Sequence, residues 1–584
     1  MKDCKIATLI LIIYIKEVHL RPWQNYIHNM KKFLFGLMIF LFVFSVNGQD
    51  NLENWMNSSS SEGSMGIDTD KTYTNLIKDK KGRLVIVAVL DSGVDVDHED
   101  LASKIWVNQD EIPDNGIDDD NNGYIDDIHG WNFIGGPDGE NVHGETLEVT
   151  RLYVYYRDKF KDVNPINLSE KEKKEYAKFL SYKKEVETQR ERAAKNYDEV
   201  APIATAVERA FEAYKKEVEF TYFNTLTLDT FYSGNQLAMI GNSVLNQILA
   251  DSGQDSLSLA EVTTEIIEQL NAEKDYYGTK LYFQYNPDFD SRATIVKDDY
   301  LNGEERIYGN NDVEGPDAHH GTHVSGIIGA IRNNSIGMNG VAENVQIMSI
   351  RVVPDGDERD KDVANGIRYA VDNGATIINM SFGKGKSWDK DLVDEAVKYA
   401  AKHDVLLVHA AGNDGQENTL SNNYPHDHYN KKGCFLFPKK RAKNWIEVGA
   451  LSTMRDTNIV AQFSNYSAEN VDVFAPGELI YSTIPDDQYE LLNGTSMAAP
   501  VVSGMAAVIR SYFPTLTAEQ VKRVLEESVI KLDQEVIKPG GDELIPFAEL
   551  SKTGGVVNLY QAYELAARTK GKKKVKEEKR RDRV

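Results

Sequence analysis

Five short apolar runs, each ending in a turn, constrain the fold of this chain more than any other feature. They lie at residues 84–90, 345–353, 375–383, 405–413 and 471–477, and amphipathic stretches at 362–374 and 392–403 stand between them. Continuous apolar runs are typical of strands buried on both faces, and their alternation with helices predicts an α/β fold with a doubly wound, mainly parallel sheet. Functional residues of such sheets gather beyond the carboxyl ends of the strands, where we expect Asp91 and Asn413.

The size and charge of the chain narrow its class further. A length of 584 residues predicts two or three domains. The net charge is −25, and residues 1–48 carry six Lys/Arg against two Asp/Glu, so the remainder has a net charge of −29. This acidity argues against nucleic acid as a partner and favours divalent cations. The two cysteines, Cys4 and Cys434, cannot build a disulfide framework.

The first 48 residues are interpreted as an upstream extension followed by a secretory signal peptide. Residues 30–49 have a dibasic start, an apolar stretch and a small-residue exit, so Met30 is the expected initiator. The protein is then exported, secreted or periplasmic, and meets the membrane only through this segment. A retained membrane anchor is the alternative, although the apolar run is shorter than the ~20 residues of a usual spanning helix.

The remaining chain divides into five predicted segments. The first is a short polar segment, 49–80, which includes a flexible stretch at 57–66. The α/β pattern occupies 81–150 and 305–563, and a charged helical insertion, 151–304, lies between its two parts. A disordered tail covers 564–584. The insertion contains a capping box, Ser169 with Glu172, and a seven-residue repeat, Phe179, Val186 and Ala193, which predict a helical hairpin or short coiled-coil arm. It is either a solvated spacer or an arm that binds an unknown protein.

Three motifs stand out within the α/β pattern. They are "AVLDSGVDVDHEDL" around Asp91, "HHGTHVSGIIGA" around His320 and "NGTSMAAPVVSG" around Ser496. Together, and in the order Asp, His, Ser, they resemble the motifs of the subtilisin-like serine proteases, or subtilases. The resemblance covers residues 81–135 and 305–563.

The resemblance implies a role for each motif residue. Ser496 would be the nucleophile, His320 the general base, and Asp91 the group that orients His320. The choice of His320 over His319 and His323 rests on the family pattern His-Gly-Thr-His. A zinc site at the three histidines is the weaker alternative, since the helical zinc-protease pattern His-Glu-x-x-His is missing.

Two further segments resemble the family's binding elements. "HAAGNDG" supplies Asn413 as an oxyanion donor, and Ala410, Ala411 and Gly412 would form one wall of the pocket for the side chain before the scissile bond. "NMSFG" resembles the strand that pairs with an extended peptide and contributes Ser381, Phe382 and Gly383. Extended or unfolded peptides and proteins are therefore the expected substrates, and no cofactor is expected for the chemistry.

Residues 114–133 form an acidic, turn-rich stretch. Asp118, Asp120, Asn122 and Asp126 occupy positions 1, 3, 5 and 9 of a calcium-loop pattern, with Gly123 at position 6, but His129 stands where the pattern has Glu. Oxygen crowding favours a structural Ca²⁺ over an ion-free acidic loop.

Two departures from the family pattern are evident. Asp91 and His320 are 229 positions apart because the insertion separates them, and only about thirty residues precede Lys81 after the leader, too few for a typical propeptide domain. The sequence thus predicts an exported serine endopeptidase that folds without a cleaved propeptide. The alternatives are a catalytically silent scaffold that binds partners through the insertion, and an esterase or amidase with the same triad.

Overall fold

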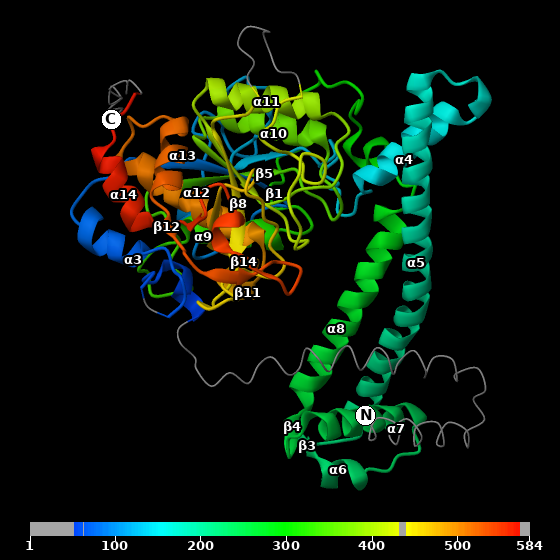
Figure 1. Cartoon of the computed structure of the whole chain (residues 1–584). Coiled ribbons are helices and arrows are strands. Elements are labelled where there is room, and N and C mark those ends of the chain that lie inside the picture. Colours follow the sequence, from blue (N-terminus) through cyan, green and yellow to red (C-terminus); the bar gives the residue numbers. More distant parts are fainter. Residues whose placement is uncertain (1–51, 62, 431–439, 573–584) are drawn as a thin grey trace. The chain divides into compact units, whose positions relative to one another are not determined.

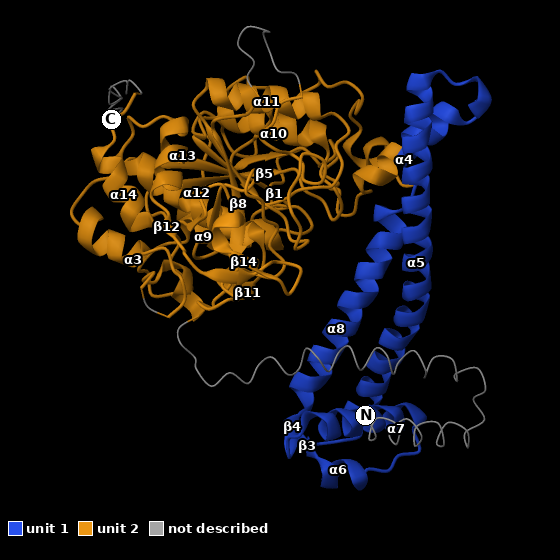
Figure 2. Ribbon diagram, in the orientation of Figure 1, with its two compact units in different colours: residues 1–49, 153–287 blue, residues 50–152, 288–584 orange. Residues whose placement is uncertain are grey.

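A computed structural model describes residues 52–61, 63–430 and 440–572, which form two compact units (Figure 2). One unit is Tyr153–Pro287, and the other combines the segments on either side of it. The predicted leader, Cys4, Cys434 and most of the predicted tail lie outside the described residues. No helix in the described ranges is both long and apolar enough to cross a membrane.

The larger unit is built on a nine-stranded sheet with the order β12-β15-β9-β8-β7-β6-β1-β5-β2 (Figure 1). All neighbouring strands are parallel except β12 and β15. The strands are β1 (Val85–Asp91), β2 (Gly130–Asn132), β5 (Val345–Arg351), β6 (Ile377–Met380), β7 (Leu406–Ala410), β8 (Trp445–Leu451), β9 (Val473–Pro476), β12 (Ile530–Lys531) and β15 (Gly555–Val556).

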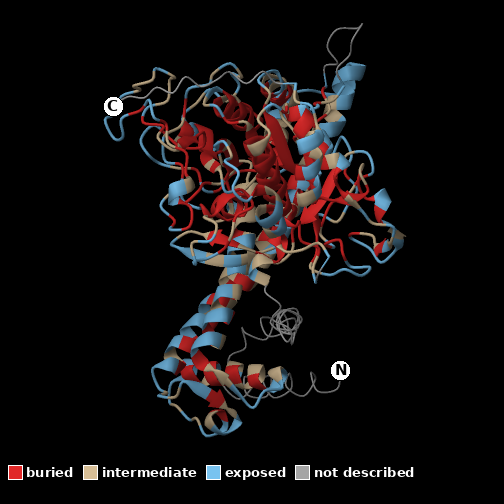
Figure 3. Ribbon diagram, turned by 90° about the vertical axis from the view of Figure 1, so that its left-hand side faces the viewer, coloured by how far each residue is buried: buried red, intermediate tan, exposed pale blue. Residues whose placement is uncertain are grey.

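Helices cover both faces of this sheet, so the predicted doubly wound fold is confirmed. In β1, Val87 and Val89 pack in one core with α9 (His319–Gly329) and α12 (Thr495–Tyr512). The alternate residues Ala88 and Leu90 pack in a second core with α10 (Asp360–Asp372) and α11 (Lys390–Lys402). Figure 3 shows the buried residues concentrated in these layers.

The five predicted strands are present, and the sequence missed one long central strand, β8. All seven residues of Trp445–Leu451 are buried. Glu447 interrupts its apolar run, which is why it did not stand out as a buried strand. A hairpin of β10 (Ile480–Ile484) and β11 (Gln488–Leu492) also escaped prediction, as did the small pair β13 (Glu535–Ile537) and β14 (Leu544–Pro546).

The N-terminal segment is part of the core, and the predicted flexible stretch at 57–66 is anchored in the larger unit at both ends, where Asn57 and Met65 are buried. Residues Leu52–Asn57 form a 3₁₀-helix, and Thr69–Thr72 form α3. Trp55 and Ile67 are buried in the same core as α9 and α12. The Trp55 indole N–H donates to the backbone oxygen of Leu479, just before β10, at 2.9 Å. Packing of these apolar side chains outweighs the serine-rich composition that suggested a linker.

Two helices complete the larger unit at its C-terminal end. They are α13 (Ala518–Glu527) and α14 (Leu559–Arg568). The predicted domain boundary at residue 563 therefore falls inside α14, where Tyr563 and Ala566 belong to the core.

The smaller unit is the core of the predicted insertion. Its main element is α5 (Glu170–Lys215), which begins with the predicted capping box of Ser169 and Glu172. The seven-residue repeat continues along α5 as the buried Val186, Ala193, Val200, Val207 and Tyr214. Of these, Val207 and Tyr214 share a core with residues of α7 (Gln236–Ser252) and α8 (Leu259–Thr279), with which α5 packs. The other elements are β3 (Tyr222–Asn224), α6 (Thr225–Asp229), β4 (Ser256–Ser258) and most of α4 (Glu148–Phe160), which begins in the larger unit.

Candidate active site

The predicted triad residues lie on three elements of the larger unit, and two of them are in direct contact. Asp91 ends strand β1 and is 1% exposed. His320 is the second residue of α9, and its Nδ1 lies 2.6 Å from the Asp91 Oδ1. Since a carboxylate can only accept, Nδ1 donates this bond, and Nε2 is left to act as a base. The Asp91 Oδ1 also accepts the Ser92 backbone N–H at 2.8 Å.

A glycine allows α9 to come this close to β1. A Cβ on Gly321 would lie 2.0 Å from the backbone oxygen of Gly93 and 3.2 Å from the Asp91 Cβ. No side chain fits there, because real Cβ atoms do not approach a backbone oxygen so closely. The Gly of the His-Gly-Thr-His pattern therefore places His320 against Asp91.

The three neighbouring imidazoles have different surroundings. Burial by itself lowers the pKa of His320, but the charge of Asp91 and the hydrogen bond to it outweigh burial and raise this pKa above its usual value. Burial lowers the pKa of His323 to about 3. His319 pairs instead with the exposed Glu490 carboxylate at 2.8 Å. Within the described residues, the histidines form no group close enough to hold a metal ion, so the zinc alternative gains no support.

Ser496 lies beside the predicted substrate strand. It is the second residue of α12, and its Oγ donates to the backbone oxygen of Ser381 at 3.0 Å. In return, the Ser381 hydroxyl donates to the backbone oxygen of Ser496 at 2.9 Å. These two bonds fix the start of α12 against the segment that follows β6. The backbone N–H of Ser496 belongs to the first turn of α12, where N–H groups have no partner inside the helix.

The side-chain amide of Asn413 is oriented by the residue before Ser496. Its Oδ1 accepts the Thr495 N–H at 2.8 Å and the Thr495 hydroxyl at 2.9 Å. The same hydroxyl accepts the Gly412 N–H at 3.0 Å, so its own hydrogen must go to Asn413. The Nδ2 of Asn413 is thereby directed away from Thr495, as a free donor requires.

The two predicted oxyanion donors converge on one point. A Cβ built on Gly494 would lie 3.4 Å from the Ser496 nitrogen and 3.5 Å from the Asn413 Nδ2. The space in front of Gly494 is therefore within reach of both N–H groups. Thr495, which sets this geometry, was not singled out from the sequence, although it stands in the motif next to Ser496.

The predicted pocket walls come from neighbouring parallel strands. Ser381, Phe382 and Gly383 follow β6, Ala410 ends β7, and Ala411 and Gly412 follow it, with Met380 and His409 in register. A Cβ on Gly383 would lie 2.9 Å from the Oδ1 of Asn423, and one on Gly412 would lie 4.0 Å from the same atom. Asn423 thus lies between the walls. No motif or periodic pattern marks this residue, which belongs to a turn-rich loop.

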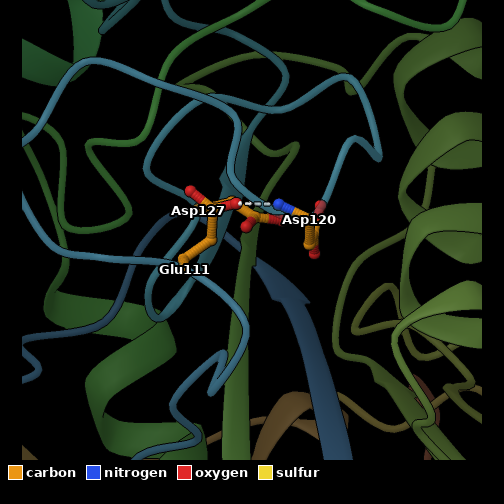
Figure 4. A group of neighbouring side chains, drawn as sticks. All are labelled: Glu111, Asp120 and Asp127. Atoms are coloured by element: carbon orange, nitrogen blue, oxygen red, sulfur yellow. Dashed lines mark hydrogen bonds between the residues drawn. The ribbon is translucent and has the colours of Figure 1, made fainter.

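The acidic stretch forms a cluster, although its members differ from those predicted. Side-chain oxygens of Glu111, Asp120 and Asp127 all lie within 4.8 Å of one another (Figure 4). Of the four predicted ligands, only Asp120 belongs to this group. Asp118 accepts the backbone N–H groups of Asn122 and Gly123, and Asp126 accepts those of Asn115 and Gly116. The side-chain amide of Asn122 donates to Asp120 and Asp127.

Comparison with known proteins identifies the family. The sequence model of the Subtilase family matches residues 82–541. The chain belongs to the subtilase family. Subtilases are serine-type endopeptidases, and the curated relatives agree. Subtilisin DY of Bacillus licheniformis is 38% identical over 219 residues, which cover 36% of this chain and 71% of that protein.

Further relatives match part of this subtilase. The major intracellular serine protease of Bacillus subtilis (strain 168) is 41% identical over 215 residues, which cover 36% of this chain and 60% of that protein. A cold adapted subtilisin-like serine proteinase of known crystal structure is 29% identical, with a TM-score of 0.33, over 43% of this chain and 78% of the other.

Proposed function

We propose that Asp91, His320 and Ser496 hydrolyse peptide bonds through an acyl-enzyme. The observation that carries this proposal is the 2.6 Å contact of Asp91 with Nδ1 of His320, which leaves Nε2 available to take a proton. The Ser496 hydroxyl would turn from the Ser381 carbonyl toward His320 and attack the substrate carbonyl carbon as its proton passes to Nε2. His320 then returns that proton to the leaving amine as the C–N bond breaks, and water repeats the sequence to release the acid.

Asn413 and the Ser496 backbone would stabilise the oxyanion formed in each half of this reaction. The Ser496 nitrogen lies 3.4 Å and the Asn413 Nδ2 lies 3.5 Å from a Cβ built on Gly494, and the Thr495 hydroxyl donates to the Asn413 Oδ1 at 2.9 Å. Donors held in place before the reaction stabilise developing charge without reorganisation.

The substrates we propose are extended or unfolded polypeptides. Ser381–Gly383 directly follow β6, and the Ser381 backbone oxygen accepts the Ser496 hydroxyl; an extended peptide would pair with the main chain of this segment. The side chain before the scissile bond would enter between Gly383 and Gly412 and meet Asn423 at its far end.

Fluorophosphonate labelling and casein hydrolysis, with Ser496→Ala as the matched control, test this function. We expect both signals in the wild type and neither in the variant. Labelling without casein hydrolysis, combined with cleavage of a small ester, would favour the esterase or amidase alternative. A folded wild-type protein that shows no labelling would favour the catalytically silent scaffold.

We also propose that the acidic cluster holds a structural Ca²⁺. Asp127 is fully buried, and its hydrogen-bond partners are the neutral side chains of Asn108, Asn122 and Tyr369. A buried carboxylate without a cationic neighbour is costly, and a hard cation with oxygen ligands would offset that cost. Glu111, Asp120 and Asp127 would supply carboxylate oxygens, and the ion would stabilise the loop without a part in catalysis. A melting temperature that does not change between EDTA and calcium would reject this proposal.

Export and a binding role for the insertion are proposals of a different kind. Export rests on the signal-like residues 30–49, and N-terminal sequencing of the protein recovered outside the cytoplasm would test it. For the insertion, the exposed side chains of Leu226 (72%) and Tyr232 (88%) are the positions at which a protein-binding arm can be tested against a solvated spacer. Cross-linking from these two positions in cell extracts would distinguish the alternatives.

A further inference from the structure

The predicted substrate strand ends at a buried lysine. Lys384 directly follows Gly383, and its side chain is 1% exposed. Its Nζ lies 2.6 Å from the Glu148 Oε2 and 2.9 Å from the Asp360 Oδ1, and it donates to the backbone oxygen of Glu358 at 2.6 Å. Three acceptors match the three hydrogens of an ammonium group. The site is therefore fully satisfied and fixes the side chain in one position.

The backbone at this position is fixed as well. The Lys384 N–H donates to the Tyr424 oxygen at 3.0 Å, and the Tyr424 N–H donates to the Lys384 oxygen at 2.9 Å. Tyr424 follows Asn423, which lies between the pocket walls. Lys384 thus connects the substrate strand, through main-chain bonds, to the loop at the far end of the pocket.

Glu148 joins this lysine to the root of the insertion. It is the first residue of α4, and its side chain is 0% exposed. Burial alone would raise the pKa of Glu148, but the charges of Arg151 and Lys384 outweigh burial and lower this pKa to about 2. Arg151 lies one turn further along α4 and binds the Glu148 Oε2 at 3.0 Å. It also donates to the backbone oxygens of Thr146, Asp357 and Glu358.

Buried ion pairs of this kind add little net stability. Removing two charges from water costs about as much as their attraction returns, so apolar residues often stabilise such a position equally well. What the pair does provide is a defined geometry, because an ammonium bound by three oxygens cannot slide along the chain. The segment whose geometry it defines is the one immediately before it, Ser381–Gly383.

We propose that Lys384 is a positioning residue for peptide binding, clamped by Glu148 and Asp360 so that Ser381–Gly383 present their main-chain groups in the register an extended substrate requires. This inference rests on the proposed function, which assigns that strand to the substrate. It extends that function to a residue that the family motifs do not include and to the first turn of α4, from which the insertion starts.

The test compares two lysine variants with two substrates. Lys361 offers a matched control: its side chain is 2% exposed, and its Nζ contacts the carboxylates of Asp298 (2.7 Å) and Glu305 (2.6 Å) and the Asp299 backbone oxygen (2.8 Å). It lies on α10 and not on the substrate strand. Lys384→Met and Lys361→Met are assayed with a tetrapeptide anilide, which pairs along the strand, and with a single-residue ester, which does not.

Lys384→Met should raise KM for the tetrapeptide roughly tenfold, the loss expected when one or two main-chain hydrogen bonds to the peptide are misplaced. Its kcat and its KM for the ester should stay within about twofold of the wild type. Lys361→Met should leave both KM values unchanged, although it loses a similar buried cluster. An unchanged tetrapeptide KM in Lys384→Met, or an equal rise in Lys361→Met, would overturn the proposal.

A second variant covers the case in which Lys384→Met does not fold, as judged by near-ultraviolet circular dichroism. Glu148→Gln keeps the contacts of Lys384 with Asp360 and Glu358, and a roughly threefold rise in tetrapeptide KM is expected. No rise in this folded variant refutes the positioning role. Failure of the proposed function would be distinct, because the wild type itself would then show no fluorophosphonate labelling.

Discussion

The side chain of Thr495 is expected to control kcat without touching the substrate. Thr495→Val keeps the shape of the residue and removes two hydrogen bonds, from the Gly412 N–H (3.0 Å) and to the Asn413 Oδ1 (2.9 Å). The Asn413 amide then retains one of its two anchors, the Thr495 N–H at 2.8 Å. Losing an oxyanion donor altogether costs about 2.7–4 kcal/mol of transition-state stabilisation, a magnitude measured on a subtilisin. Losing one of the two bonds that orient the donor should cost ~1–1.5 kcal/mol, or about tenfold in kcat.

Steady-state hydrolysis of a peptide anilide measures this effect, with Asn413→Leu as the reference for complete loss of the donor. KM should not change. Thr72→Val is the control, since the buried Thr72 hydroxyl also donates to a backbone oxygen, that of Asp68 at 2.6 Å, in the N-terminal segment. In the Asn413→Leu background, Thr495→Val should have no further effect on kcat, because both act through one donor. A full tenfold loss in that background, or none in the wild-type background, would refute the reasoning.

Three other outcomes are expected. In the proposed mechanism His320 acts as a neutral base, and its pKa is raised, so kcat/KM should rise with pH through a value above the usual histidine range. Asp91→Asn should shift that limb of the profile to lower pH and reduce kcat by about 10⁴. Trp55→Ala should lower the free energy of unfolding, measured by calorimetry, by about 3–5 kcal/mol, because Trp55 is only 4% exposed. Tyr232→Ala, at an 88% exposed site, is the control. An equally small effect of both substitutions would contradict the place of Trp55 in the core. Burial raises the pKa of Asp127 from 3.8 to about 6. The ion-free protein should therefore lose stability as pH rises from 3.8 to 6, because the buried carboxyl group ionises. The rise in melting temperature with calcium should disappear as pH falls through 6, because the ion binds the ionised carboxylate.

The sheet and the contact of His320 with Asp91 could be predicted because both leave local signals. The strand Val85–Asp91 is a continuous apolar run as far as Leu90. Asp91, His320 and Ser496 lie in motifs whose glycines and small residues have direct geometric causes, as Gly321 shows. The seven-residue repeat of α5 likewise marks its buried face. In these cases the neighbours in sequence are sufficient to indicate the structure.

The missed features depend on partners distant in sequence. Glu447 is tolerated inside β8 because His409 on β7 and the side-chain amide of Asn423 form hydrogen bonds with its carboxylate. No pattern in the neighbouring sequence predicts these contacts. Trp55 packs in a core built by residues distant in sequence, and the backbone oxygen of Leu479, 424 positions away, accepts its N–H. Calcium-loop spacing suggested Asp118 and Asp126, yet their carboxylates cap nearby turns, while Glu111 and Asp127 come from outside the spaced positions.

The insertion leaves and rejoins the larger unit at a single carboxylate. The Ser291 hydroxyl donates to the Glu145 side chain across 146 positions of sequence, and Arg359 binds the same carboxylate at 3.0 Å. The inserted segment therefore affects the sheet no more than a short connecting loop would. Lengthening such a loop costs little free energy. An insertion attached in this manner can be replaced by another of different size and chemistry. The same active site could therefore acquire a different accessory domain without changes in the core.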